Sequence, residues 1–227
     1  LHTAEKVIEN GREIAAHVLE AAPVDIEFEN GLFAVVGTDR TVSILELAEH
    51  VREGLPEGVR QTLDAELAED PPPSAFPNGC HIVEVEITPE TGDVKVDRYH
   101  IVDDFGTLVN PMLVEGQVHG CITQGLGQAL MEDTLYDEQG QLITGSFMDY
   151  VMPRADTVPN FESAVNENAI TATNPIGVKG AGEAGCVGAM PALMNAIVDA
   201  LRPAGVKTLD MPATPQRVWA ALREVRG

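Results

Sequence analysis

One carboxylate stands out in a loop that is unusually rich in glycine. Glu183 is the only acid between Asn174 and Gly185, and four glycines lie within nine residues there, at positions 177, 180, 182 and 185. Glycines at this density indicate a backbone that adopts unusual dihedral angles or passes close to another group. The dipole of a helix that follows would favour an ionised carboxylate, which suits a general base at neutral pH. The loop therefore predicts a base at Glu183.

Two other interpretations of this loop are open. Glu183 could simply cap the following helix from an exposed position, with Pro191 in the first turn of that helix. If Glu183 instead lies in a dry site, burial would favour its protonated form. Gly180–Gly185 also matches the dinucleotide-binding pattern G-x-G-x-x-G, with Asp210 downstream. That match is disfavoured, because no buried apolar strand precedes it and too little chain follows for a doubly wound sheet.

The second candidate site is a helical pattern in which primary amides lie beside glycines. At about 100° per residue, one stripe consists of Gln117, Cys121, Gln124 and Gln128. Gly116, Gly120 and Gly127 form a stripe next to it. Each helical glycine costs roughly 1 kcal/mol relative to alanine, so something must offset that cost. A flat ligand such as a pterin could approach here and bond to the amides; a tightly packed buried helix is the alternative.

Hydrophobic periodicity predicts the elements that carry these sites. In the first part of the chain we expect a helix over 3–21 capped by Thr3, a hairpin of strands 24–29 and 32–36, and a second helix that begins at Ser43. Further on we expect a strand from His81, a turn over 89–92 and a partner strand over 94–102. Helical patterns cover 112–133 and 189–201. Strand pairs mixed with helices, without regular β-α-β alternation, predict an α+β fold with mixed or antiparallel sheets packed with helices.

The domain organisation follows from the proline run at 71–73. We expect a helix-hairpin-helix lobe over 1–70, a proline-rich linker over 71–79, and a lobe over 80–227 that holds both candidate sites. A single compact domain is the alternative.

Composition excludes several classes of function. With 36 acidic and 14 basic residues, the formal charge of −22 disfavours nucleic acid and anionic membrane surfaces as partners. The apolar run 187–201 is broken by Asn195 and Asp199 and looks too short to span a bilayer. The three scattered cysteines suit a reducing cytoplasm and predict neither an iron–sulfur cluster nor a metal site within this chain.

Five segments in this order resemble the molybdenum hydroxylase family, which includes xanthine dehydrogenases, aldehyde oxidoreductases and the large subunits of aerobic carbon monoxide dehydrogenases. The segments are 103–120, 124–130, 145–156, 177–183 and 210–219. The resemblance is specific over residues 80–223 and less distinctive before them. It identifies the chain as similar to the C-terminal part of the molybdenum-cofactor-binding large subunit.

The resemblance implies roles for particular residues. Glu183 matches the active-site base that deprotonates the molybdenum-bound hydroxide, and Gln117 matches a contact to the pterin. Gly116, Gly120 and Gln124 belong to the helix that packs near the cofactor. In the loop, Gly180 and Gly182 are expected on the cofactor side, while Lys179 and Gly182 flank the base as supporting residues.

The resemblance also implies what lies outside this chain. The cofactor is expected to be molybdopterin with molybdenum, in its cytosine dinucleotide form, and it would be shared with residues elsewhere in the large subunit because the family's earlier cofactor loops are absent here. We therefore expect the chain alone to be inactive. Iron–sulfur and FAD centres are expected on partner subunits, and the substrate is a small molecule such as an aldehyde, an N-heterocycle or carbon monoxide. Homo-oligomer formation stays open, and a cofactor-free interaction or scaffold domain is the competing function.

Overall fold

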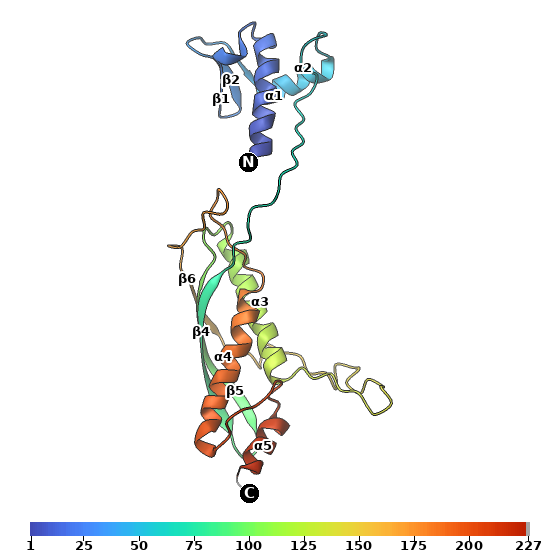
Figure 1. Ribbon diagram of the computed structural model, residues 1–227, viewed down its shortest axis with the longest axis vertical. Helices are drawn as coiled ribbons and strands as arrows, with labels where there is room; N and C mark the ends of the chain where they lie inside the picture. The colour runs from blue at the N-terminus through green and yellow to red at the C-terminus, as the bar shows by residue number, and fades with distance from the viewer. Residues whose placement is uncertain (226–227) are drawn as a thin grey trace. The chain divides into compact units, whose positions relative to one another are not determined.

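The computed structural model describes residues 1–225, and the chain divides into two compact units (Figure 1). Unit 1 comprises Leu1–Pro71 and unit 2 comprises Pro72–Gly227. Each unit buries an apolar cluster of its own.

Unit 1 packs two helices against a small antiparallel sheet of order β1-β2-β3. Its elements are α1 (His2–Val18), η1 (Pro23–Asp25), β1 (Ile26–Glu29), β2 (Leu32–Val35), β3 (Thr41–Ser43) and α2 (Ile44–Glu53). Ser43 and Glu46 form a reciprocal capping box at the start of α2, which confirms the predicted helix start. Phe33 and Leu47, both fully buried, lie in the core between sheet and helices.

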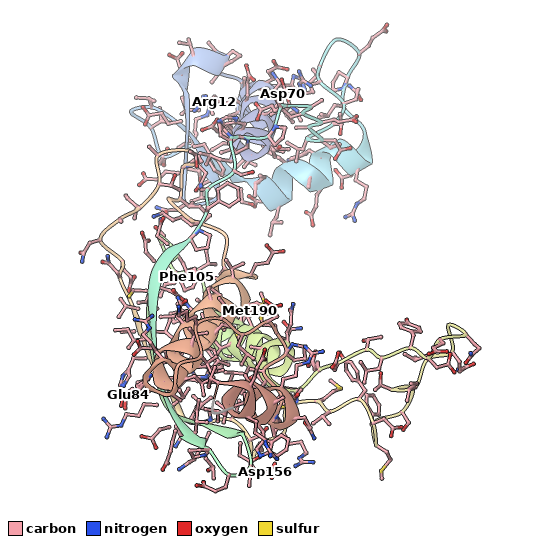
Figure 2. The ribbon with its side chains drawn as sticks, turned by 60° about the horizontal axis from the view of Figure 1, so that its bottom comes forward. Arg12, Asp70, Glu84, Phe105, Asp156 and Met190 are labelled. Carbon is pink, nitrogen blue, oxygen red and sulfur yellow. The ribbon has the colours of Figure 1, made fainter. Side chains whose placement is uncertain are left out.

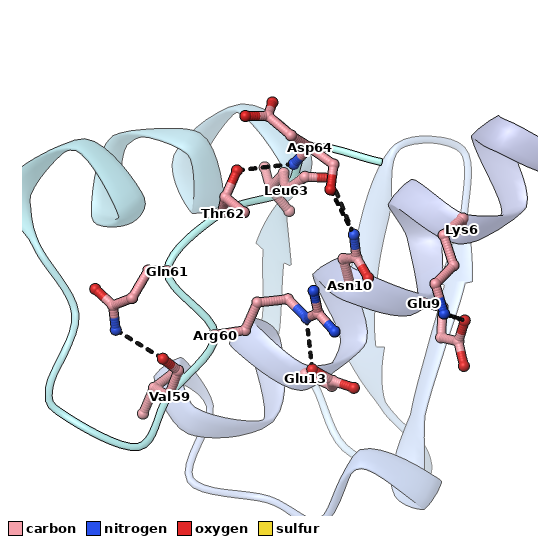
Figure 3. Close-up of polar contacts among 10 residues, drawn as sticks. All are labelled: Lys6, Glu9, Asn10, Glu13, Val59, Arg60, Gln61, Thr62, Leu63 and Asp64. Atoms are coloured by element: carbon pink, nitrogen blue, oxygen red, sulfur yellow. Dashed lines mark hydrogen bonds and ion pairs between the residues drawn. The ribbon is translucent and has the colours of Figure 1, made fainter. Parts of the chain in front are cut away.

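The segment that follows α2 is held against α1 by polar contacts (Figure 3). Asn10, which is buried, donates from Nδ2 to the carbonyl oxygen of Asp64 at 2.9 Å. Arg60 pairs with Glu13 at 2.6 Å. These contacts order a stretch that contains neither helix nor strand.

Unit 2 is a three-stranded sheet covered by two long helices. Its elements are β4 (Asn78–Thr88), β5 (Asp93–Asp104), α3 (Pro111–Leu130), β6 (Phe161–Val165), α4 (Ala184–Leu201), η2 (Arg202–Ala204) and α5 (Pro215–Glu224). β4 and β5 form the predicted antiparallel hairpin, and β6 adds to β5 in parallel. The helix α4 packs on β4, and α3 packs on α4 (Figure 1). The residues between α3 and β6 extend away from these helices as an arm, seen with its side chains in Figure 2.

Some of the glycines that stood out in the sequence serve helix packing. A Cβ on Gly125 would lie 2.6 Å from Cβ of Ala189, and a Cβ on Gly185 would lie 2.6 Å from the carbonyl oxygen of Val118. Both glycines therefore let α3 and α4 approach closely. Gly127 is also packed, against Pro153.

Several predicted boundaries were wrong. α1 begins after Leu1 without a side-chain cap and ends at Val18, so Thr3 does not cap it. α4 begins at Ala184, which places Pro191 inside the helix rather than in its first turn. The strands β3 and β6 and the helix α5 were not predicted from the sequence.

The most apolar helix is also longer than the sequence suggested. By length and composition alone, Ala184–Ala204 would suffice to cross a membrane. In unit 2, however, α4 buries one residue per turn in the core. These residues are Gly185, Ala189, Leu193, Ile197 and Leu201. That single buried stripe describes a helix that packs on β4 and α3.

Candidate functional site

Glu183 occupies the N-cap position of α4 and is exposed. Its backbone has φ −119° and ψ −9°, and its side chain makes no capping hydrogen bond. The position thus agrees with the helix-cap interpretation, but the bond that would define a cap is absent. The carboxylate is therefore free to face another group from the N-terminus of α4.

The loop that leads to Glu183 is fixed to the end of β5 by backbone bonds. Lys179 donates its N–H to the carbonyl oxygen of Phe105 at 2.8 Å, and Thr107 donates to that of Gly177 at 3.0 Å. Gly106, with φ +64°, lies against the carbonyl of Gly177 where a Cβ would clash. Gly106 therefore allows the two backbones to meet, while Gly177 in the loop has φ +70°, an unusual dihedral angle of the kind that the glycine density predicted.

An ion pair anchors the same loop. Lys179 Nζ lies 2.6 Å from Asp104 Oδ2, and both side chains are only 10% exposed. Asp104 Oδ1 also accepts a hydrogen bond from the N–H of Gly106 at 2.8 Å. The hydrogen bond from Lys179, followed by the bond from Gly106, lowers the pKa of Asp104 below its ordinary value. Lys179 thus supports the placement of Glu183.

Replacing Asp104 with Asn is expected to destabilise the protein in a pH-dependent way. A charge-assisted hydrogen bond contributes about 1–3 kcal/mol to stability. At neutral pH the free energy of unfolding of the variant should therefore be lower by an amount of that order. Because the pKa of Asp104 is lowered in the folded state, its contribution is present above the unfolded value of about 3.9 and is lost as pH falls through the folded value. Denaturant titrations of both proteins from neutral pH to acid measure this difference.

The matched control is Asp156→Asn. Asp156 pairs with Arg154, but both side chains are at least 70% exposed, so this change should cost less than about 0.5 kcal/mol. If Asp104→Asn lowers the free energy of unfolding as little as Asp156→Asn does, or by the same amount in acid as at neutral pH, the ion pair does not anchor the loop.

The loop is also tied to α3 through a cysteine. Cys121 Sγ donates to the carbonyl oxygen of Gly182 at 2.9 Å. Burial, with smaller contributions from Cys121 and Glu183, raises the pKa of the neighbouring Cys186 thiol. Cys121 is buried, so it lies at the covered edge of the stripe whose glutamines are exposed.

One face of α3 is open and carries the predicted amides. Gln117 and Gln124 are exposed, and within residues 1–225 their side chains make no hydrogen bond. A Cβ on Gly116 or Gly120 would meet nothing within 4 Å. Gly127 is packed, so the open glycine stripe comprises Gly116 and Gly120 alone. The helix thus offers unpaired amides beside a surface without side chains.

The two loop glycines differ in their surroundings. Gly180 donates its N–H to the carbonyl oxygen of Ala75 at 3.0 Å. A Cβ on Gly182 would meet nothing within 4 Å. Gly182 therefore faces open space directly before Glu183, whereas Gly180 holds the loop to the segment before β4.

A pocket of about 320 Å³ joins Glu183 to residues that the sequence analysis did not select. It is lined by Phe76, Pro77, Asn78, Gly79, His81, Asp103, Glu183, Ala184, Val187 and Gly188. His81 Nε2 lies 3.4 Å from Asp103 Oδ1, and His81 Nδ1 lies 2.9 Å from the hydroxyl of Tyr99. The signal for His81 was present, because it alternates with Val83, Val85 and Ile87 on the inward face of the strand.

A larger cavity of about 840 Å³ lies elsewhere in unit 2, between β5, residues 156–160 and residues 213–216. Its lining includes neither Glu183 nor the amides of α3. Glu183, His81 and Asp103 therefore line the smaller pocket, whereas the amides of α3 line neither of the two.

Comparisons with known proteins all indicate the same family. The chain matches the molybdopterin cofactor-binding domain family over residues 1–159. It is 38% identical over 224 residues to the carbon monoxide dehydrogenase large chain of Hydrogenophaga pseudoflava, covering 97% of this chain and 28% of that protein. It is 39% identical over 216 residues to the nicotine 6-hydroxylase large subunit of Paenarthrobacter nicotinovorans, covering 93% of this chain and 26% of that protein.

The fold agrees with these sequence matches. The carbon monoxide dehydrogenase from Oligotropha carboxidovorans superposes with a TM-score of 0.83 at 33% identity, covering 99% of this chain and 28% of that chain. The chain spans little more than a quarter of the length of each of these proteins.

Proposed function

The chain belongs to the molybdopterin cofactor-binding family of molybdenum hydroxylase large subunits, and from this premise we propose that it supplies one wall of the cofactor site and the general base, Glu183. The observation that carries the proposal is the juxtaposition at the start of α4. The free Glu183 carboxylate follows the open Gly182, and Cys121 ties that loop to the helix of the unpaired amides.

The residues of this face fit a molybdopterin. A pterin is flat and carries hydrogen-bond donors and acceptors along its edge, which primary amides can match. Gly116 and Gly120 leave room for a flat group beside Gln117 and Gln124. We assign the pterin contacts to these four residues, and we assign Gly180 and Gly182 to the shaping of the loop on the cofactor side.

When bound, the molybdenum cofactor supplies two-electron redox chemistry for oxidative hydroxylation. The part of this chain is to hold the cofactor and to move a proton. Glu183 accepts one proton at a carboxylate oxygen, and the bonds from Lys179 and Cys121 keep its loop in place. Glu183 lies at the N-terminus of α4, where the helix dipole places partial positive charge.

The rest of the enzyme completes this site in our proposal. The chain would pair with the remainder of the large subunit, and iron–sulfur and FAD centres would lie on partner subunits. The cofactor would be the cytosine dinucleotide form, the enzyme would work in the cytoplasm, and the substrate would be a small aldehyde, N-heterocycle or carbon monoxide. The relatives named above differ in substrate by their names, so substrate selection is assigned to residues outside this chain.

Molybdenum and pterin content tests the proposal. The 227-residue chain purified alone is expected to contain little of either, because it provides only one wall of the site. The same chain within the complete large subunit should contain close to one equivalent of each. A complete subunit that folds but contains no molybdenum or pterin would instead support a cofactor-free scaffold domain, and stoichiometric molybdenum in the isolated chain would refute the shared site.

A further inference from the structure

A buried histidine–aspartate pair forms the floor of the Glu183 pocket. The side chains of His81 and Asp103 are 6% and 3% exposed, whereas Phe76, Asn78 and Glu183 in the same lining are exposed. We propose, on the basis of the proposed function, that His81 and Asp103 are the proton-transfer partners of Glu183. They take over the proton that Glu183 accepts, and so return Glu183 to its carboxylate form between turnovers.

Strand register brings the pair together. His81 on β4 is opposite Ile101 on β5, so Tyr99 and Asp103 lie on the same face, two residues to either side. The imidazole reaches both of these diagonal neighbours, with Nδ1 at the Tyr99 hydroxyl and Nε2 toward Asp103. Three polar groups thus form a continuous row on the helix-covered face of the hairpin.

Donor and acceptor in the Tyr99–His81 hydrogen bond depend on which ring nitrogen of His81 carries hydrogen, and the proposal takes that nitrogen to be Nε2. Burial, and then the nearby Asp103 carboxylate, raise the pKa of Tyr99, so its hydroxyl keeps its proton. That hydroxyl can donate to Nδ1 of His81. Nε2 then carries the ring hydrogen and directs it toward Asp103 Oδ1.

Stability alone does not explain this arrangement. Asp103 Oδ2 is buried and has no hydrogen-bond partner within residues 1–225, which is unfavourable for a carboxylate. Two glycines make room for the pair: Gly79 lies against Asp103 Oδ1, and a Cβ on Gly188 would lie 2.6 Å from the His81 ring. Apolar residues of similar volume would stabilise such a site at least as well. A polar pair with an unpaired oxygen beside Glu183 is arranged to accept a proton.

The proposed transfer is balanced. A volume of about 320 Å³ has room for water, which occupies about 30 Å³ per molecule in the liquid. The O–H bond of protonated Glu183 breaks, a water passes its proton on, and the Asp103–His81 pair gains one proton while Glu183 becomes a carboxylate. No electrons move. Asp104, which follows Asp103 on β5, is already paired with Lys179.

Kinetics of the complete enzyme separate this role from a structural one. Asp103→Asn and His81→Gln are compared with wild type, with carbon monoxide, nicotine and benzaldehyde as probes of the substrate site. The first anaerobic reduction should stay within about threefold of wild type, because that step needs Glu183 to accept a proton but not yet to pass one on. Steady-state turnover should fall by about 10²-fold or more, because loss of a proton-transfer group typically costs about 10²–10⁴-fold in rate, and added imidazole should restore part of it.

The control is His100→Gln. His100 lies on β5 and pairs with the exposed Glu162, so this variant should change neither rate. If both rates of Asp103→Asn and His81→Gln fall together without rescue by imidazole, or if neither rate falls, the proposal is overturned. Failure of the Glu183 assignment is distinguishable, because it would appear as an undiminished first reduction in Glu183→Gln.

A second measurement needs no substrate. In the 227-residue chain labelled with ¹⁵N-histidine, at about pH 8.5 where free imidazole is neutral, the ring shifts of His81 report which nitrogen carries hydrogen; His81→Gln assigns the signal. The proposal expects hydrogen on Nε2. Hydrogen on Nδ1 would make Tyr99 the acceptor and break the row, which would overturn the proposal.

Discussion

Replacing Gly120 with Leu is expected to empty the cofactor site while leaving the fold intact. A Cβ at this position meets nothing within 4 Å, and leucine is favoured over glycine in a helix by roughly 1 kcal/mol. The melting temperature should therefore stay the same or rise. If the pterin lies on this face, the leucine side chain occupies its place, and molybdenum content should fall by about tenfold or more, equivalent to at least ~1.4 kcal/mol of binding.

The same helix provides the control for this prediction. In Gly125→Leu the new side chain is directed at Ala189, because even a Cβ added at Gly125 would lie 2.6 Å from Cβ of Ala189. Overpacking of this kind costs about 1–3 kcal/mol or more. That variant should lose stability first. Gln117→Ala should lower molybdenum content without lowering stability, whereas Gln128→Ala, an exposed amide two turns further along α3 than Gly120, should change neither. Full molybdenum content in Gly120→Leu would show that the open face of α3 is not the cofactor face.

Local sequence patterns were sufficient to predict those elements that are stabilised by contacts between residues close together in the sequence. The hairpin of β4 and β5 follows from alternating apolar and polar residues around the turn at 89–92. The start of α2 follows from the Ser43 and Glu46 capping box. These features depend on contacts a few residues apart, so the sequence alone could specify them.

The missed elements lack such local signals or have conflicting ones. β6 has one half-buried residue followed by exposed ones, so it shows no alternation. The start of α4 was obscured by Gly185 and Gly188, which are typical of loops but here admit Val118 and His81. The signal for α5 was available, because Thr214 caps a helix whose first residue is Pro215.

The candidate site also divides into residues that local sequence patterns reveal and residues that only the tertiary structure reveals. The glycine density and the single carboxylate selected Glu183 from the sequence, and the amides of α3 selected Gln117 and Gln124. The division of the helical glycines into open and packed ones required the tertiary structure. His81 and Asp103 are 22 residues apart and meet only through strand register, which no local pattern reveals.

The largest kinetic effect is expected for Glu183→Gln. Glutamine keeps the shape of the side chain but cannot accept a proton, and loss of a general base costs about 10²–10⁴-fold in rate. Because Glu183 is exposed in this chain and makes no capping bond, the change should alter neither stability nor molybdenum content. The loss should therefore appear in the reduction of the enzyme by substrate rather than in cofactor binding. Glu90→Gln, in the turn between β4 and β5, is the matched control and should have no effect.

Anaerobic reduction of the complete enzyme by its substrate, followed by stopped flow at equal molybdenum content, tests the central claim most directly. If this chain provides the base of a molybdenum hydroxylase, Glu183→Gln is reduced at least about a hundredfold more slowly than wild type, while Glu90→Gln is reduced at the wild-type rate. A reduction rate of Glu183→Gln within a few-fold of wild type would remove Glu183 from the mechanism and leave it only as the residue at which α4 begins.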